Sequence, residues 1–367
     1  MLPLYRSIRY WGASGLREAG AIRFMMSAHG MKWILIGIIA LLALLGTFVF
    51  LASRRGWIRN GYFTILSTIL IVLGAFICFQ ALGTLLTIGV NGGKLEGNNL
   101  AALAMNGVAQ LAVMLGGAVL ISRAAGQNPF AVFRLEGFHE TPVSAYILSI
   151  PIILSAQAVG VAISSFWTLF LEYFPHFYSV VDKFESAGDE QLQGMVTAHG
   201  TLEFVLIFLF VAIIPAFAEE TLFRGFAQSN IERSGHRHAR PMVALVVTSL
   251  LFASIHLSLF KLPGLLALGL ALGWMAYRTN NLFVGSLGHA ANNGIIVIAL
   301  YLNPEVARDS ANSTIVGNAN LSAMDALLSL AISGPMLAIL LYLFSRVTEH
   351  NTARFNSERE LSELTEP

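Results

Sequence analysis

The sequence has little charge, almost no cysteine and few aspartates. Only 12% of its 367 residues are charged, and the formal net charge is +1, which does not favour a nucleic-acid partner. Cys78 is the only cysteine, so the chain contains no internal disulfide and no metal site built from several cysteines. No aspartate lies in the long apolar runs, which removes a paired-aspartate mechanism. No His-Glu-x-x-His occurs either.

Apolar residues dominate instead. They make up 56% of the chain, and the mean hydropathy is +0.69, far above that of a soluble domain. Apolar runs separated by polar breaks predict an all-α, polytopic transmembrane helix bundle of about eight or nine spans. The nine runs are Trp33–Ala52, Tyr62–Val90, Leu100–Ser122, Val143–Phe170, Leu202–Ile231, Pro241–Leu257, Leu262–Tyr277, Leu282–Leu302 and Ala326–Phe344.

The polar breaks divide the chain into six predicted parts. The first apolar run is long enough to cross a bilayer, so the basic segment before it is an interfacial arm rather than a secretory signal. Basic loops mostly follow the odd-numbered runs, which predicts that these loops and the C-terminal tail are cytoplasmic. The parts are a basic N-terminal arm (1–31), accessory transmembrane helices (32–173), an acidic loop (174–200), a helical core with buried polar residues (201–302), a loop and final helix (303–345) and a charged tail (346–367).

Charged residues in the fifth apolar run require a local explanation. A single charge at the centre of a membrane helix costs about 2.5 to 3.5 kcal/mol on insertion scales. On a helix, Glu220 and Arg224 are i and i+4 neighbours and can pair. Glu219 is rotated by about 100° from Glu220 and has no local partner, as a general base requires.

Two histidines occur in two other runs of the same half. His256 follows Phe252 by four residues, and Asn293 follows His289 by four, so each pair shares a helix face. An ionisable residue inside a membrane indicates a functional site by default. Glu219 and the two histidines therefore predict an active site between helices of the C-terminal half.

Three short motifs contain these residues. They are Glu219-Glu220-x-x-x-Arg224, Phe252-x-x-x-His256 and His289-x-x-x-Asn293. Each is weak alone, but three in this order, each in its own apolar run, form a fairly specific combination. On these motifs the chain resembles the CAAX protease and bacteriocin-processing family (CPBP, also called Abi), intramembrane endopeptidases that include the type II CAAX prenyl endopeptidases.

The resemblance implies hydrolysis of a peptide bond inside the membrane by a catalytic core at residues 201–302. Glu219 would deprotonate a water molecule that His256 helps to hold. His289 and Asn293 would donate hydrogen bonds to the oxyanion of the tetrahedral intermediate. The supporting residues would be Glu220 and Arg224, which brace the helix and orient Glu219, and Phe252 at the pocket wall.

The need for a metal is open at this point. The family is commonly labelled a metalloprotease, and Glu219, His256 and His289 make a plausible zinc triad. A Glu and His pair that activates water without zinc fits the same residues.

Two functions other than proteolysis also fit the sequence. A proton-coupled transporter could use Glu219, His256 and His289 as a proton relay. It would predict inverted repeats, whereas the buried polar residues are concentrated in one half of the chain. The other alternative is a non-catalytic immunity or scaffold protein of the membrane.

The expected partners follow from proteolysis in a membrane. They are a membrane protein or peptide as substrate and the lipid bilayer, with no nucleic acid. We expect a multi-pass integral membrane protein of the plasma (inner) membrane of a bacterium.

Overall fold

The structure, a computed structural model, describes most of the chain after residue 57. The described residues are 58–59, 61–91, 99–196, 198, 200–234, 240–302 and 321–354, together with Thr47 and Ser357. The predicted N-terminal arm (1–31) and, apart from Thr47, the first predicted span lie outside them. The described residues form helices except for one short antiparallel pair of strands, β1 (Ile58–Arg59) and β2 (Tyr62–Phe63). The all-α prediction is therefore confirmed for this part of the chain.

The described residues of the N-terminal half lie mainly in long helices. Thr64 caps the first of them, where its side chain accepts a hydrogen bond from the backbone N–H of Ser67. The second long helix is continuous through a π-helical middle section. The elements are α3 (Ile65–Val90), α4 (Asn99–Gln110), η1 (Leu111–Gly117), α5 (Ala118–Ala124), α6 (Pro129–Val132), α7 (Val143–Leu171) and α8 (Pro175–Val196).

The C-terminal half begins with one long helix that contains two π-helical segments. Pro215 lies just after the first segment, and the pair Glu219-Glu220 lies directly before the second. Segments of this kind are frequent at functional sites. The elements are α9 (Thr201–Phe208), η2 (Leu209–Ile213), α10 (Ile214–Glu220), η3 (Thr221–Gln228), α11 (Ser229–Arg233), α12 (Arg240–Ile255), α13 (Leu262–Thr279), α14 (Leu282–Leu302) and α16 (Ala323–Val347).

Among the described residues, six helices are long and apolar enough to cross a membrane, by length and composition. The apolar parts of α12 and α13 are shorter than the roughly 20 residues that a straight crossing needs. The predicted count of eight or nine spans is therefore not reproduced in the described part of the chain. The six are Ile65–Val90, Leu100–Ala124, Val143–Leu171, Thr201–Arg233, Leu282–Leu302 and Ala323–Val347.

One predicted part has a different structure. Most of the predicted acidic loop, 174–200, is the helix α8, in which Phe177, Val180, Val181 and Phe184 recur at helical spacing. The last predicted apolar run, Ala326–Phe344, lies within the helix α16. This helix begins at Ala323, since the Ser322 side chain caps it and Asp325 lies in its first turn.

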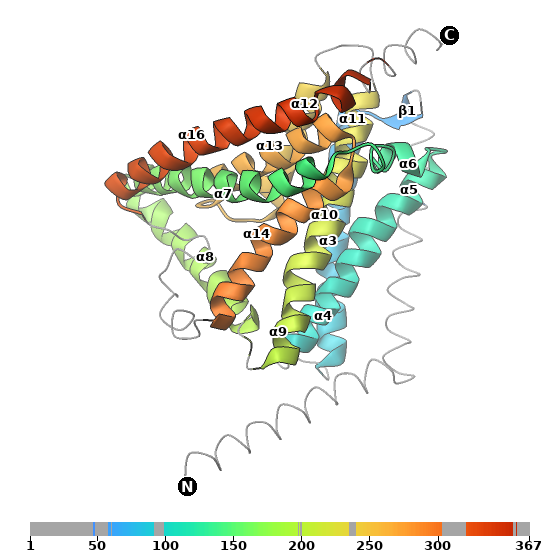
Figure 1. The fold of residues 1–367 in the computed structure, drawn as a ribbon. Coiled ribbons are helices and arrows are strands. Elements are labelled where there is room, and N and C mark those ends of the chain that lie inside the picture. The colour runs from blue at the N-terminus through green and yellow to red at the C-terminus, as the bar shows by residue number, and fades with distance from the viewer. Residues whose placement is uncertain are drawn as a thin grey trace.

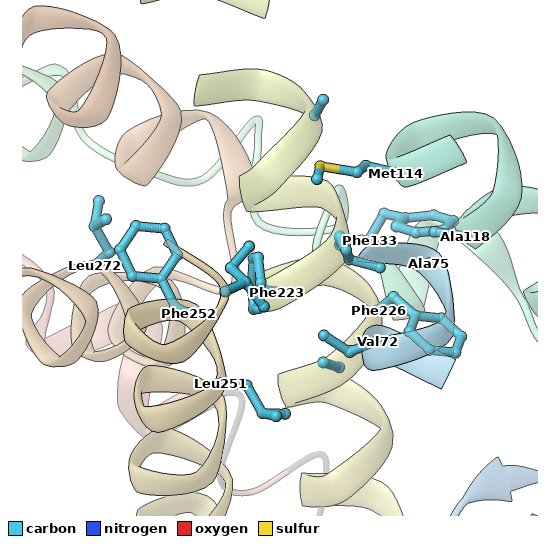
Figure 2. Packing of buried hydrophobic residues seen from close by; sticks show 14 of the residues in the cluster. Val72, Ala75, Met114, Ala118, Phe133, Phe223, Phe226, Leu251, Phe252 and Leu272 are labelled. Atoms are coloured by element: carbon cyan, nitrogen blue, oxygen red, sulfur yellow. The ribbon is translucent and has the colours of Figure 1, made fainter. Parts of the chain in front are cut away.

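The helices are arranged so that the second half of the glutamate-bearing helix lies inside the bundle. Figure 1 shows α16 along α7, with α9 and α10 running across their direction beside α4. Figure 2 shows Phe223 and Phe226 of η3 between two sets of apolar side chains. Phe252 and Leu272 lie on one side, and Met114 and neighbouring side chains of the N-terminal half lie on the other. This helix therefore packs against apolar side chains from both halves of the chain.

Close approach of α7 to α13 depends on glycine. A Cβ on Gly160 would lie 2.9 Å from the Cα of Gly264, where real Cβ atoms are essentially never found. A Cβ on Gly74 of α3 would meet nothing within 4 Å. Small residues that let helix backbones touch are the usual means of packing in membranes.

We predict that Gly160→Ala destabilises the protein by about 1 to 3 kcal/mol, because the new methyl group forces α7 away from α13. Gly74→Ala is the matched control and should change stability by no more than about 1 kcal/mol. The measurement is thermal unfolding of both variants in the same detergent. Equal unfolding midpoints for the two variants would contradict the close approach of α7 to α13 at Gly160.

Candidate active site

The site contains a buried ion pair. Glu220 Oε1 lies 2.7 Å from Arg224 Nη1, and the two side chains are 0% and 1% exposed. This confirms the pairing predicted from their spacing. Arg224 also donates to the carbonyl of Gly269 at 3.2 Å, and its guanidinium lies 4.5 Å from the centre of the Phe252 ring. These contacts compensate the buried charge.

Glu220 also holds His289, a contact that the sequence did not predict. The same Oε1 lies 3.1 Å from His289 Nδ1. A carboxylate paired with an arginine accepts hydrogen bonds, so the hydrogen of this contact lies on Nδ1. Gly285 leaves space for the carboxylate, because a Cβ there would lie 3.1 Å from Glu220 Oε2. The orientation of the imidazole is thereby fixed.

Glu219 lies on the other side of the same imidazole. Its Oε2 is 4.0 Å from His289 Nε2, and the side chain is buried. Gln110 of α4, itself buried, donates from Nε2 to Glu219 Oε1 at 3.5 Å. Sequence reasoning missed Gln110, although it is one of two amide side chains, with Asn106, in the apolar run Leu100–Ser122, and this was an available signal.

His256 lies apart from this group, at the end of α12. It is exposed, and its Nδ1 is 2.7 Å from the carbonyl oxygen of Phe252, so Nδ1 carries a hydrogen and donates it. The ring of Phe252 is 4.8 Å from that of His256 and 5.8 Å from that of His289. Within the described residues no hydrogen bond or ion pair joins His256 to Glu219. One aromatic ring separates the two histidines.

Asn293 lies one helical turn beyond His289 on α14. Its Nδ2 donates to the carbonyl of Val211 at 3.4 Å. Pro215 has no N–H, so it cannot give that carbonyl the hydrogen bond that an ordinary α-helix would provide. Asn293 therefore contacts the glutamate-bearing helix at its first π-helical segment.

The donors do not form a metal site in this arrangement. Catalytic zinc usually takes three protein ligands and a water molecule. In the described ranges, no group of three or more His, Cys, Asp or Glu side chains could hold a metal ion. Glu219 and His289 lie close together, but His256 does not join them.

Comparison with known families supports the resemblance seen in the motifs. Residues 201–295 match the family model described as type II CAAX prenyl endopeptidase Rce1-like. The chain carries a CAAX protease family domain. This Rce1-like domain runs from α9 into α14 and includes all seven motif residues, whereas Gln110 lies outside it. Neither the curated proteins nor the solved structures gave a match to the chain.

A second buried ion pair joins the Rce1-like domain to the N-terminal half. Arg134 Nη2 lies 2.8 Å from Glu232 Oε1, with both side chains 1% exposed. Arg134 also donates from Nε to the carbonyl of Arg224 at 2.9 Å. Arg134 follows the third apolar run, where the sequence predicts a cytoplasmic loop, and its side chain is buried in the structure. The backbone that carries Arg224 is thus held from outside the domain.

We predict that the two adjacent glutamates differ sharply in their effect on stability. Glu220→Gln should destabilise the protein by about 3 to 5 kcal/mol, because Arg224 keeps a buried charge without its counter-charge. Glu219→Gln is the matched control and should have a much smaller effect, since no arginine depends on it. Thermal unfolding and abundance in the membrane measure both. Equal destabilisation by the two changes would show that the ion pair is not the supporting contact.

Proposed function

We propose that the protein is an intramembrane endopeptidase that hydrolyses a peptide bond of a membrane-associated protein or peptide. The Rce1-like domain and the six apolar helices support this class of activity. The observation that carries the proposal is the 4.0 Å separation between Glu219 Oε2 and His289 Nε2, with the imidazole held by Glu220.

This separation suits a water molecule. It is too long for a direct hydrogen bond, yet one water can contact both atoms. In the proposed mechanism Glu219 is the general base that removes a proton from this water. The water oxygen then attacks the peptide carbonyl carbon, and the tetrahedral intermediate forms.

The charges of the group indicate how the oxyanion is stabilised. Glu219 and Glu220 against Arg224 leave one uncompensated negative charge, which is costly in a buried site. The imidazolium form of His289 would have a hydrogen on Nε2 in addition to the one that Nδ1 donates to Glu220. We propose that the imidazolium donates from Nε2 to the oxyanion, and that the second N–H of the Asn293 amide adds a further donor.

Collapse of the intermediate completes the reaction. The proton on Glu219 passes to the leaving nitrogen as the carbon–nitrogen bond breaks, giving a carboxylate end and an amine end. Phe252 packs between the two imidazoles and under Arg224. His256 is exposed, and its Nε2 makes no hydrogen bond within the described residues. This supports a role in contacting the substrate backbone or the water at the entrance rather than within the buried group.

The first test is a comparison of membrane-protein termini in cells that carry the wild-type protein or the Glu219→Gln variant. Specific cleaved termini should fall by about 100-fold or more in the variant, because a general base contributes at least that much. Mass spectrometry measures the termini, with protein abundance checked in parallel.

Glu172→Gln makes the same chemical change at an exposed site outside the Rce1-like domain, and it should leave those termini unchanged. Unchanged termini in Glu219→Gln, together with loss of a proton-coupled uptake or of toxin resistance, would overturn the protease proposal.

A second test concerns metal. Since Glu219 and His289 supply only two neighbouring donors, we predict that purified protein in liposomes keeps its cleavage activity after dialysis against a zinc chelator. Elemental analysis of the same sample should show far less than one zinc per chain. Activity that disappears with the chelator and returns when zinc is added would contradict the metal-free mechanism.

A further inference from the structure

The helix α8 carries a buried carboxylate that the mechanism does not use. Glu185 is 7% exposed, and its neighbours on the same face are Tyr178 and Val181. The neighbouring face of the helix exposes Phe177, Val180 and Phe184. In Figure 1, α8 slants away from the end of α7 at the edge of the bundle. Glu185 therefore lies on the side of α8 that turns toward the other helices.

Within the described residues, all the hydrogen bonds to Glu185 come from one short loop. Its Oε1 accepts from the backbone N–H of Leu259 at 2.6 Å and of Phe260 at 3.1 Å, and its Oε2 accepts from the Ser258 hydroxyl. Within the described residues no lysine or arginine forms an ion pair with it. A carboxylate buried in this way is held by the loop, and it holds the loop in turn.

This loop begins immediately after His256. Leu257 has a φ of 53°, a left-handed conformation that non-glycine residues rarely adopt without support. The Trp167 indole N–H donates to the carbonyl of Leu259 at 3.0 Å, and α13 starts at Leu262. The backbone N–H groups that Glu185 binds precede the N-terminus of α13, where a negative charge is favourable. The loop is thus fixed at several points directly beside His256.

We propose that Glu185 is a positioning residue that acts through this loop to set the place of His256 at the site. The inference rests on the proposed protease function, but it names a residue outside the Rce1-like domain. The role requires hydrogen-bond acceptors rather than charge. A glutamine at this position keeps one acceptor oxygen for the two N–H groups, whereas an alanine keeps none.

The test has two arms. The first arm is independent of catalysis and measures hydrogen exchange of residues 256–261 in the wild-type protein, Glu185→Ala and Glu185→Gln. Asp182→Ala, on the exposed side of the same helix, is the matched control. Exchange at Leu259 and Phe260 should accelerate in Glu185→Ala alone.

The second arm uses proteoliposomes and a synthetic peptide that spans a terminus lost in Glu219→Gln cells. Glu185→Ala should lower kcat by about 10-fold with little change in KM, because a misplaced group slows the chemical step. Glu185→Gln should restore kcat to within about 2-fold of wild type. If Glu185→Ala does not fold, Ser258→Ala is tested in its place. It removes one hydrogen bond between the loop and Glu185 without changing α8, and it should lower kcat by a smaller factor.

The outcomes separate this inference from the proposed function. Wild-type exchange and wild-type kcat in Glu185→Ala would overturn the role of Glu185, while Glu219→Gln would still abolish cleavage. Equal loss in Glu185→Ala and Glu185→Gln would show that charge, and not positioning, is what the loop needs. Absence of cleavage by the wild-type protein would refute the protease proposal, and the exchange arm would still decide whether Glu185 holds the loop.

Discussion

One oxygen atom, Oε1 of Glu220, accepts hydrogen bonds from both Arg224 and His289, and the rest of the site depends on it. Without it, a guanidinium would be buried without a counter-charge, and the imidazole could rotate. With it, the imidazole has one nitrogen engaged and the other turned toward Glu219. The buried ion pair and the imidazole that faces Glu219 therefore share one carboxylate oxygen, and in the proposed mechanism each of the two adjacent glutamates has a different role.

The bundle holds this contact from both halves of the chain. The helix that carries Glu219 and Glu220 is buried over most of its second half, and Figure 2 shows apolar side chains of both halves around η3. Gln110 reaches Glu219 from α4, and Arg134 binds the backbone of Arg224. The N-terminal helices are thus part of the site's support, even though the family match covers only residues 201–295.

The sequence predicted contacts within a helix better than contacts between helices. The spacing of Glu220 and Arg224 identified their pairing, because i and i+4 residues share a face. The distance from Glu220 to His289 could not be predicted, since no local pattern sets how two helices approach. Glu185 falls within the predicted acidic loop, because a sequence rich in acidic residues indicates a solvent-exposed segment. The backbone N–H groups that bind its carboxylate lie far away in the sequence and could not be predicted. The contact of Asn293 with Val211 could have been predicted. Pro215 has no N–H, so the carbonyl of Val211 lacks its usual α-helical donor and needs another one.

If Glu220 orients the His289 imidazole, the Nδ1 of that ring must carry a proton, and the position of this proton can be measured. Nitrogen-15 NMR of histidine-labelled protein in bilayers distinguishes a protonated ring nitrogen from a bare one. The chain has nine histidines, so a His289→Gln sample identifies the signals by difference. We expect a protonated Nδ1 on His289. An Nδ1 without a proton, with the only proton on Nε2, would show that Glu220 does not orient the ring.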